Sequence, residues 1–417
     1  MAREELGGER AAGGGLLHRR ALLRWSAVSA AGLSAERVMA QEGLPASMLE
    51  PGAPLSPRGA PGPAGEAIRR IVPDLAFPGT GSSRTPVHLL EGTITPNDLH
   101  FERHHNGIPT IDPGTFQLLL HGLVRRPLVF RYEDLLRYPR ESRLLFIECS
   151  GNSGALSASQ PVQASAGQLH GLVSCAEWTG VRLSTLLDEA GLLPGVRWIE
   201  AEGADAAAMT RSIPLSVGLD DAMIALFQNG EPLRPAQGYP MRLLLPGIEG
   251  NASVKWLRRL KVRAQPVFSR EETAKYTDLR RDGKAEMFSL RMGVKSVIVS
   301  PSFGLDLGAK GYREISGLAW SGRGRIRSVE VSADGGASWA EAALGDVQPK
   351  ALTRFRMPWH WDGGPAVLLS RATDDTGAVQ PTRETWLAKQ GHGQGYHSNA
   401  MQSWAVDTAG RVTHVYA

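Results

Sequence analysis

The sequence predicts an α+β domain followed by an immunoglobulin-like β-sandwich. In the middle of the chain, short apolar runs alternate with turns and two short helical segments. In the C-terminal third, strand-like runs recur at short intervals around a hairpin signature. Glycine and proline number 48 and 27, and this abundance favours turns and β-structure over long helices.

The composition excludes several classes of protein. Apolar residues are 42% and charged residues 21%, which is typical of a globular chain. No run reaches the roughly 18 apolar residues of a membrane span. The net charge of +4 gives no electrostatic case for binding nucleic acid. With two cysteines, the chain can form neither a disulfide framework nor a Cys-rich zinc or iron–sulfur site, and it has no C-x-x-C-H haem motif.

The first 40 residues have the pattern of a twin-arginine export signal. Arg19 and Arg20 precede an apolar pair, a weakly apolar stretch at 25–35 and small residues at 38–40. A short amphipathic basic helix is the alternative interpretation. Residues 41–89, rich in proline and glycine, are expected to form an extended arm or linker with little core of its own.

The segment 90–275 is expected to form the α+β domain. Its predicted strands are 116–124, 129–131, 143–149, 197–202, 241–245 and 254–263, and its predicted helices are 132–138 and 183–190. Pro139 and Gly191 would end the two helices. In the last strand, Leu257 and Arg258 break the alternation of apolar and basic residues, which allows a bulge. The basic face of this strand is more often solvated than part of a ligand site.

The segment 285–410 is expected to form the β-sandwich. Its predicted strands are 312–320, 326–331, 338–343, 353–359 and 367–372. Asp334-Gly335-Gly336 lies between the second and third of these strands and is typical of a hairpin turn. A carbohydrate- or protein-binding sandwich stays open as an alternative, because a fold does not decide a function.

Cys149 closes a buried strand and opens a glycine-containing loop, residues 149–154. The end of a strand holds a side chain rigidly, and a thiolate there would be a soft metal ligand. Taken alone, a single cysteine is more often a small buried hydrophobe, and we interpret Cys175 in that way.

Several motifs together resemble the sulfite oxidase family of molybdenum enzymes. The resemblance covers about residues 90–410, and the motifs follow one another in family order. They are FERHH at 101–105, ECSGN at 148–152, the run GYPMR–LPG–VKWL between 238 and 257, and Tyr276, 21 residues after Lys255. The leader, the ERHH stretch and HGLVSCAEWTG at 170–180 are similar to the sulfane dehydrogenase branch of this family. The resemblance implies a sulfite-oxidase-type molybdopterin domain and a sandwich that serves as a dimerisation domain.

The resemblance also implies a molybdenum–molybdopterin cofactor and a role for eight residues. Cys149 would ligate molybdenum, Arg103 would attract an anionic sulfur species, and Tyr276 would form a hydrogen bond near the reactive oxo group. The residues expected to hold the pterin and its phosphate are His105, Asp205, Arg242, Ser253 and Lys255. Without the motif order, Arg103 could be a surface ion-pair member and Tyr276 an ordinary loop aromatic.

Two departures from the family pattern bear on the substrate. Ser153 and Gly154 stand where sulfite oxidases have basic residues, and Gln237 stands where they commonly have a histidine. A less positive and more open pocket weakens the case for small free sulfite. It favours sulfane sulfur on a carrier protein.

The sequence therefore predicts a periplasmic molybdenum oxidoreductase that oxidises carrier-bound sulfane with oxygen from water. Because the chain has no haem or iron–sulfur motif of its own, the electron acceptor is expected to be another protein, and the resemblance implies that it is a c-type cytochrome subunit. The chain is expected to form a homodimer through the C-terminal domain. It is not expected to bind nucleic acid or to span a membrane. The alternatives are a sulfite dehydrogenase on the same fold and, more distantly, a non-catalytic secreted binding protein.

Overall fold

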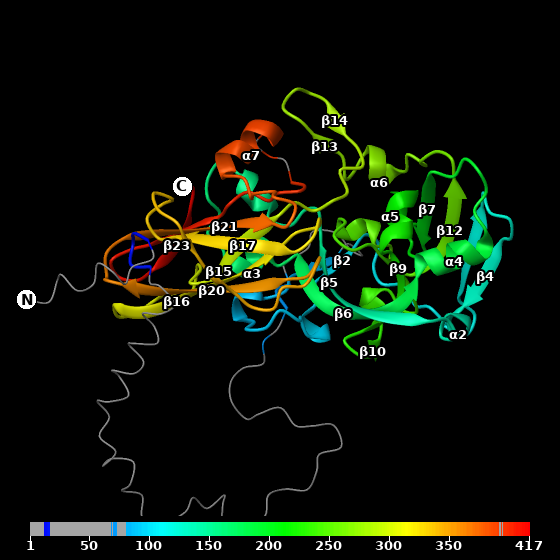
Figure 1. Ribbon diagram of the computed structural model, residues 1–417, viewed down its shortest axis with the longest axis horizontal. Helices are drawn as coiled ribbons and strands as arrows, with labels where there is room; N and C mark the ends of the chain where they lie inside the picture. Colours follow the sequence, from blue (N-terminus) through cyan, green and yellow to red (C-terminus); the bar gives the residue numbers. More distant parts are fainter. Residues whose placement is uncertain (1–11, 17–67, 69, 73–80, 392, 394) are drawn as a thin grey trace, which may run out of the picture.

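The computed structural model describes residues 12–16, 68, 70–72, 81–391, 393 and 395–417, which form two adjoining β-rich units (Figure 1). The twin arginines and most of the predicted arm lie outside the described residues. No helix in the described part of the chain is long and apolar enough to cross a membrane.

The first unit is built on two five-stranded sheets. One sheet contains β5 (Arg140–Glu148), β6 (Val173–Arg182), β9 (Met223–Gln228), β10 (Glu231–Pro232) and β11 (Arg242–Leu244). The other has the order β4 (Leu128–Arg131), β3 (Gln117–Gly122), β12 (Leu257–Arg263), β7 (Trp198–Gly203) and β8 (Thr210–Pro214), with β3 and β12 parallel. The helices are short: α2 (Tyr132–Leu135), α3 (Ala166–His170), α4 (Leu183–Ala190), α5 (Leu215–Asp220) and α6 (Arg270–Thr273). This mixture is the α+β architecture that the sequence predicts.

Details of this unit confirm the local reasoning. Helix α4 has the predicted bounds, and the backbone N–H of Gly191 caps its end. The pairing of β12 with β7 shifts register between Leu257 and Arg259, which is the predicted bulge. The basic face of β12 is partly exposed, and Arg259 donates to Glu200 at 2.8 Å. It is therefore an ion-paired strand face.

The second unit is a sandwich of two antiparallel sheets. One has the order β15 (Lys295–Ser300), β16 (Gly311–Trp320), β20 (Thr353–Trp361) and β19 (Ala343–Leu344). The other has β18 (Ala340–Glu341), β17 (Ile326–Ser332), β21 (Ala366–Asp374), β22 (Ser403–Val406) and β23 (Val412–Val415). β17 and β18 form the hairpin predicted at Asp334-Gly335-Gly336. The strand predicted at 338–343 is split between β18 and β19, which belong to different sheets.

Two segments from the predicted leader and arm pack on these units. Leu16 is buried in the core of the sandwich, and Trp359 Nε1 donates to the Gly14 carbonyl at 2.6 Å. Strand β1 (Gly81–Ser83) pairs with β2 (Glu102–His104). The last residues of the predicted arm therefore take part in the fold and fix the strand that carries Arg103.

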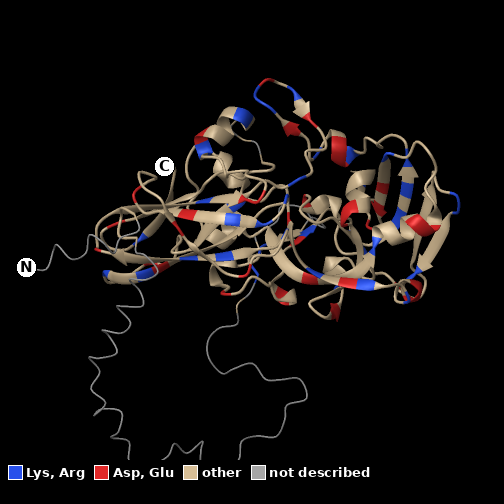
Figure 2. Ribbon diagram, viewed as in Figure 1, with Lys and Arg blue, Asp and Glu red and all other residues tan. Residues whose placement is uncertain are grey.

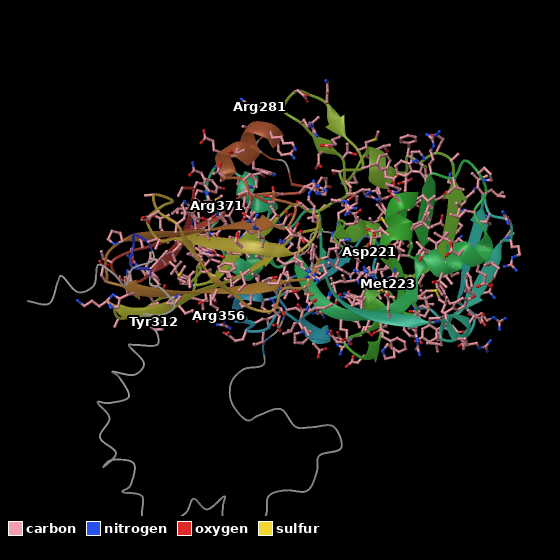
Figure 3. The ribbon with its side chains drawn as sticks, in the orientation of Figure 1. Asp221, Met223, Arg281, Tyr312, Arg356 and Arg371 are labelled. Carbon is pink, nitrogen blue, oxygen red and sulfur yellow. The ribbon has the colours of Figure 1, made fainter. Side chains whose placement is uncertain are left out.

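The two units share one core. Phe146 and Cys175, from the first unit, belong to the same hydrophobic cluster as the interior of the sandwich. Lys350 Nζ donates to Asp221 at 2.6 Å across the boundary, and Figure 3 labels Asp221 there. Cys175 is fully buried, and burial raises the pKa of its thiol to about 12, as expected for a buried apolar side chain.

Candidate active site

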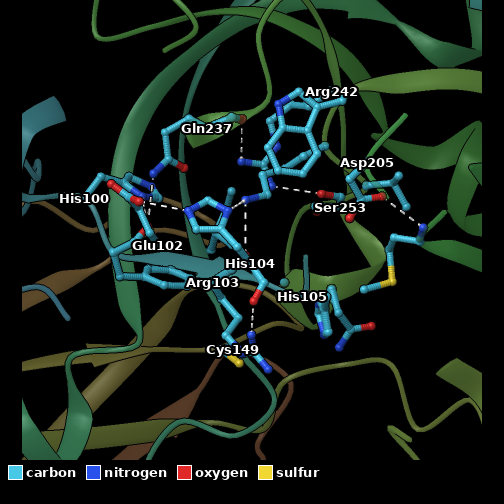
Figure 4. A pocket seen from close by; sticks show the side chains of 18 of the residues that line it. His100, Glu102, Arg103, His104, His105, Cys149, Asp205, Gln237, Arg242 and Ser253 are labelled. Atoms are coloured by element: carbon cyan, nitrogen blue, oxygen red, sulfur yellow. Dashed lines mark hydrogen bonds and ion pairs between the residues drawn. The ribbon is translucent and has the colours of Figure 1, made fainter. Parts of the chain in front are cut away.

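One cavity brings together all eight residues that the sequence singles out. It lies in the first unit, close to the boundary with the sandwich. The eight come from segments far apart in the chain: Arg103, His105, Cys149, Asp205, Arg242, Ser253, Lys255 and Tyr276. In Figure 4, Cys149 lies at one end of the cavity and Arg242 at the other.

Cys149 is held at the end of β5 by its own backbone. Its N–H donates to the Leu172 carbonyl and its carbonyl accepts from the Asn152 N–H, both at 2.9 Å. The side chain is partly exposed to the cavity, and burial raises the pKa of its thiol. No group of three His, Cys, Asp or Glu among the described residues could hold a metal ion.

Two buried cations lie at the opposite end of the cavity. Lys255 Nζ donates to the Arg103 carbonyl at 3.1 Å and to His104 Nδ1 at 2.9 Å. Burial, and then the charge of Arg242, lowers the pKa of Lys255 well below its usual value. Burial lowers the pKa of Arg242 to about 9. The charge of Asp205 acts in the opposite direction, and Glu102 also lines the cavity, but the burial of two basic side chains at this end favours an anionic ligand.

Arg242 gives a direct test of whether an anionic cofactor fits. Its two terminal nitrogens donate to the carbonyls of Gln237 at 3.1 Å and Ser253 at 2.8 Å. Its Nε is buried without a hydrogen-bond partner among the described residues. A buried donor without a partner is rare, and a phosphate or pterin acceptor would satisfy it.

The end near Cys149 carries the groups suited to a substrate. His105 Nε2 and the Tyr276 hydroxyl are hydrogen-bonded at 2.7 Å. Burial, and then the charge of Arg103, lowers the pKa of His105 to about 4, while burial raises the pKa of Tyr276. Both side chains are therefore uncharged at neutral pH. Tyr276 has a positive φ of 51°, a backbone strain that is common at functional sites.

His104 also lines the cavity and is buried, although the motifs do not assign it a role of its own. It is 6% exposed, and its ring bonds to Glu102 at 2.8 Å as well as to Lys255. Burial, and then the charge of Lys255, lowers its pKa to about 3. The structure thus sets His104 beside the buried cations and His105 beside Tyr276. His104 is the last residue of β2 and His105 directly follows the strand, and the two adjacent histidines have different partners.

The sandwich contributes residues that hold the cysteine loop from behind. Lys295 Nζ donates to Glu148 at 2.6 Å and Trp320 Nε1 donates to the same carboxylate at 2.7 Å. Glu148 directly precedes Cys149, is 0% exposed, and also accepts from Asn152 of the loop. An acidic residue at the end of a buried strand indicates that it has a hydrogen-bonded or charged partner. The partner, Lys295, is 147 residues away in the sequence, and no motif near Glu148 identifies it.

A second contribution from the sandwich follows α7 (Arg383–Gln390). The Tyr396 ring lies 5.4 Å from that of Tyr276, and the His397 N–H donates to the Ser150 carbonyl at 2.8 Å. The imidazole of His397 contacts Glu249 at 3.3 Å. Burial alone would lower the pKa of His397, but the hydrogen bond and charge of Glu249 raise it. This segment therefore packs against the cysteine loop and against the ring of Tyr276.

The three residues that depart from the family pattern have distinct surroundings. Ser153 Oγ contacts His170 Nδ1 at 2.7 Å, behind the loop, and does not line the cavity. A Cβ at Gly154 would lie 3.1 Å from the Gly395 carbonyl. Gln237 does line the cavity and donates to the Phe101 carbonyl at 3.1 Å. No charged group therefore occupies these three positions.

Comparison with known protein families gives two matches along the chain. Residues 105–271 match the oxidoreductase molybdopterin binding domain, and residues 286–403 match the Mo-co oxidoreductase dimerisation domain.

Individual proteins resemble the chain over most of its length. Sulfite oxidase of Gallus gallus is 31% identical over 328 residues, which is 72% of this chain and 71% of that protein. Mitochondrial sulfite oxidase of Mus musculus is 32% identical over 322 residues, and the chain spans 59% of its length. One chain in the crystal structure of the sulfane dehydrogenase SoxCD from Paracoccus pantotrophus is 44% identical, with a TM-score of 0.83. That match covers 88% of this chain and 96% of the other.

Proposed function

Because this chain belongs to the sulfite oxidase family of molybdopterin oxidoreductases, we propose that it oxidises sulfane sulfur presented by a carrier protein. Its cofactor is molybdenum–molybdopterin. When bound, this group supplies a centre that accepts two electrons while sulfur gains an oxygen atom from water. Each such step converts one sulfur and one water into an oxygenated sulfur, two protons and two electrons.

The residues of the cavity fit this cofactor. Arg242, with its unpartnered Nε, and Lys255 would bind the phosphate and pterin, with Asp205, Ser253 and the histidines of FERHH beside them. Cys149 would supply the thiolate ligand at the opposite end. Binding of the anionic group would neutralise the two buried cations that the protein leaves largely uncompensated.

The residues around Cys149 would bind and orient the sulfur donor. Arg103 would attract a terminal sulfur anion by a charge-assisted hydrogen bond. Tyr276, held by His105 at 2.7 Å, would present a protonated hydroxyl to a developing negative charge on oxygen or sulfur. The Tyr396 ring, 5.4 Å from that of Tyr276, would help to hold Tyr276 in place.

The observation that carries the choice of substrate is the lack of a charged side chain at two positions of the cysteine loop. Ser153 and Gly154 bear no charge, and Arg103 is the cavity-lining cation whose charge acts on the Cys149 thiol. A small dianion such as sulfite is held best by several cations, whereas a single terminal sulfur on a carrier needs one. The 44% identity to a sulfane dehydrogenase chain supports the same choice.

Sulfite dehydrogenation is the second candidate, because the curated relatives at about 31% identity are sulfite oxidases. Steady-state kinetics of the molybdenum-loaded protein separates the two. The test substrates are a carrier protein bearing a cysteine persulfide and free sulfite. We expect kcat/KM for the carrier to exceed that for sulfite by at least tenfold, and the reverse order would favour the sulfite dehydrogenase.

The electrons would leave one at a time to a separate c-type cytochrome. Neither Cys149 nor Cys175 lies in a haem-attachment motif, so this chain offers no haem of its own. Reduction of a c-type cytochrome by the substrate-reduced protein in stopped flow would test this. Absence of electron transfer to any c-type cytochrome would contradict it.

Export and assembly complete the proposal. The twin-arginine leader would deliver a folded, cofactor-loaded protein to the periplasm, and the dimerisation domain would join two copies. Lysine at both Arg19 and Arg20 is expected to leave unprocessed protein in the cytoplasm. Normal periplasmic appearance of this variant would contradict the interpretation of the leader. Light scattering of the purified protein would show whether it is a dimer.

A further inference from the structure

A short hairpin projects from the molecule beside the active site. It consists of β13 (Asp278–Leu279) and β14 (Ala285–Glu286), paired antiparallel and connected by a turn at Gly283. Figure 1 shows it standing clear of both units, between α6 and α7. Its position invites the question of what it contacts.

Both ends of the hairpin are tied to the cavity. Tyr276, which lines the cavity, lies two residues before β13. On the return side, Ser289 Oγ contacts His397 Nε2 at 3.3 Å, and the His397 N–H donates to the Ser150 carbonyl of the cysteine loop. The hairpin therefore rises from the wall of the active site.

The hairpin and the residues just before it carry more exposed basic than exposed acidic side chains. Lys275, Arg281 and Lys284 are exposed, and none of them forms an ion pair with another described residue. Arg281 lies at its tip in Figure 3, and Figure 2 shows basic residues on both sides of the turn. Asp282 is the exposed acid between them, since Glu286 pairs with Arg280 and Asp278 is buried.

Apolar side chains are exposed at the base of the same element. Leu279 is 49%, Met287 40% and Phe268 51% exposed. Exposed apolar residues bordered by cations are typical of a surface that binds another protein. The three exposed cations outnumber the exposed Asp282 beside them, and this local excess of positive charge matches an acidic face of that protein.

We infer that the hairpin β13–β14 is the docking element for the acidic face of the sulfur-carrier protein. The inference rests on the proposed sulfane activity. A carrier must bring its sulfur through the entrance to Cys149, so its docking surface has to adjoin the cavity wall. An electron acceptor has no need to enter the cavity and can approach from other faces.

The experiment compares three molybdenum-loaded proteins: the wild type, R281E/K284E, and R125E/R137E as a control with the same charge change. Arg125 and Arg137 are exposed in the first unit, outside the cavity and the hairpin. The measurements are kcat/KM with a carrier protein bearing a cysteine persulfide, kcat/KM with free sulfite, and the Kd of the carrier by calorimetry. Each is made at low and high salt.

For R281E/K284E we expect at least a tenfold loss of kcat/KM and of affinity for the carrier at low salt, and a smaller loss at high salt. Turnover of free sulfite should stay within twofold of the wild type, and the control should match the wild type throughout. Equal carrier kinetics and affinity in the two variants would overturn the inference. So would a loss confined to reduction of a c-type cytochrome, which would assign the hairpin to the electron acceptor.

Failure of the proposed function has a different signature. A wild type that binds the carrier through the hairpin but does not oxidise its sulfur would refute the sulfane activity and leave the docking surface in place. A wild type that does not bind the carrier at all would overturn the docking inference itself.

Discussion

Replacing Lys295 by methionine tests whether the sandwich supports the active site. Lys295 is 1% and Glu148 0% exposed, and their atoms lie 2.6 Å apart. In Lys295→Met the carboxylate keeps the hydrogen bonds from Trp320 and Asn152 but loses its counter-charge. Removing one partner of a buried pair costs about 3–5 kcal/mol, so we expect the free energy of unfolding to fall by this amount.

The assay is urea denaturation of the loaded protein, together with its molybdenum content. The matched control is E148Q/K295M, which removes both charges and keeps one amide oxygen to accept from either Asn152 or Trp320, since these donate to different oxygens of Glu148. Replacing both members of a buried pair by neutral groups is often close to neutral, and with one donor left unpaired the double variant should recover part of the loss. A decrease below about 1 kcal/mol in Lys295→Met, or no recovery in the double variant, would refute the reasoning.

Three further predictions concern the cavity itself. Cys149→Ser should fold and keep most of its pterin but lose catalysis, because a hydroxyl is a harder and poorer ligand than a thiolate. As a control, Cys175→Ala should remain active. Wild-type turnover in Cys149→Ser would contradict the assignment of Cys149 as the metal ligand. Arg103→Gln should lower kcat/KM about tenfold to a hundredfold, and Arg103→Lys should lower it less, because it keeps the charge without the planar fork; equal kinetics in the three proteins would contradict the anchor role. His100 is buried, and burial lowers its pKa to about 3, below the value of about 6.5 in the unfolded chain. Between these two pH values the unfolded chain binds a proton that the folded chain does not bind. The free energy of unfolding therefore falls as the pH falls through this window. His100→Gln should reduce that slope by up to about 1.4 kcal/mol per pH unit in urea denaturation at a series of pH values, and an unchanged slope would exclude this source.

Local sequence patterns predicted those elements whose signal lies within a few residues. Helix α4 has an apolar face and a terminal glycine, so its bounds follow from its own residues. The bulge in β12 follows from a break in alternation at Leu257 and Arg258, and the β17–β18 hairpin from its Asp-Gly-Gly turn. The strand expected at 338–343 was wrong as one element, because its two halves pair with strands of different sheets. No local pattern records that choice of partner.

For the active site, the sequence by itself determined the chemistry of the cavity: a thiol at the end of a strand and the basic and aromatic groups around it, identified by motifs in family order. Only the tertiary structure decided which groups act together. It set His105 against Tyr276 and His104 against Lys255, and it brought Lys295 and His397 from the sandwich to the cysteine loop. The physical reason is that motifs record short-range spacing, whereas a buried charge finds its partner through the packing of two units, across 147 residues for Glu148 and Lys295.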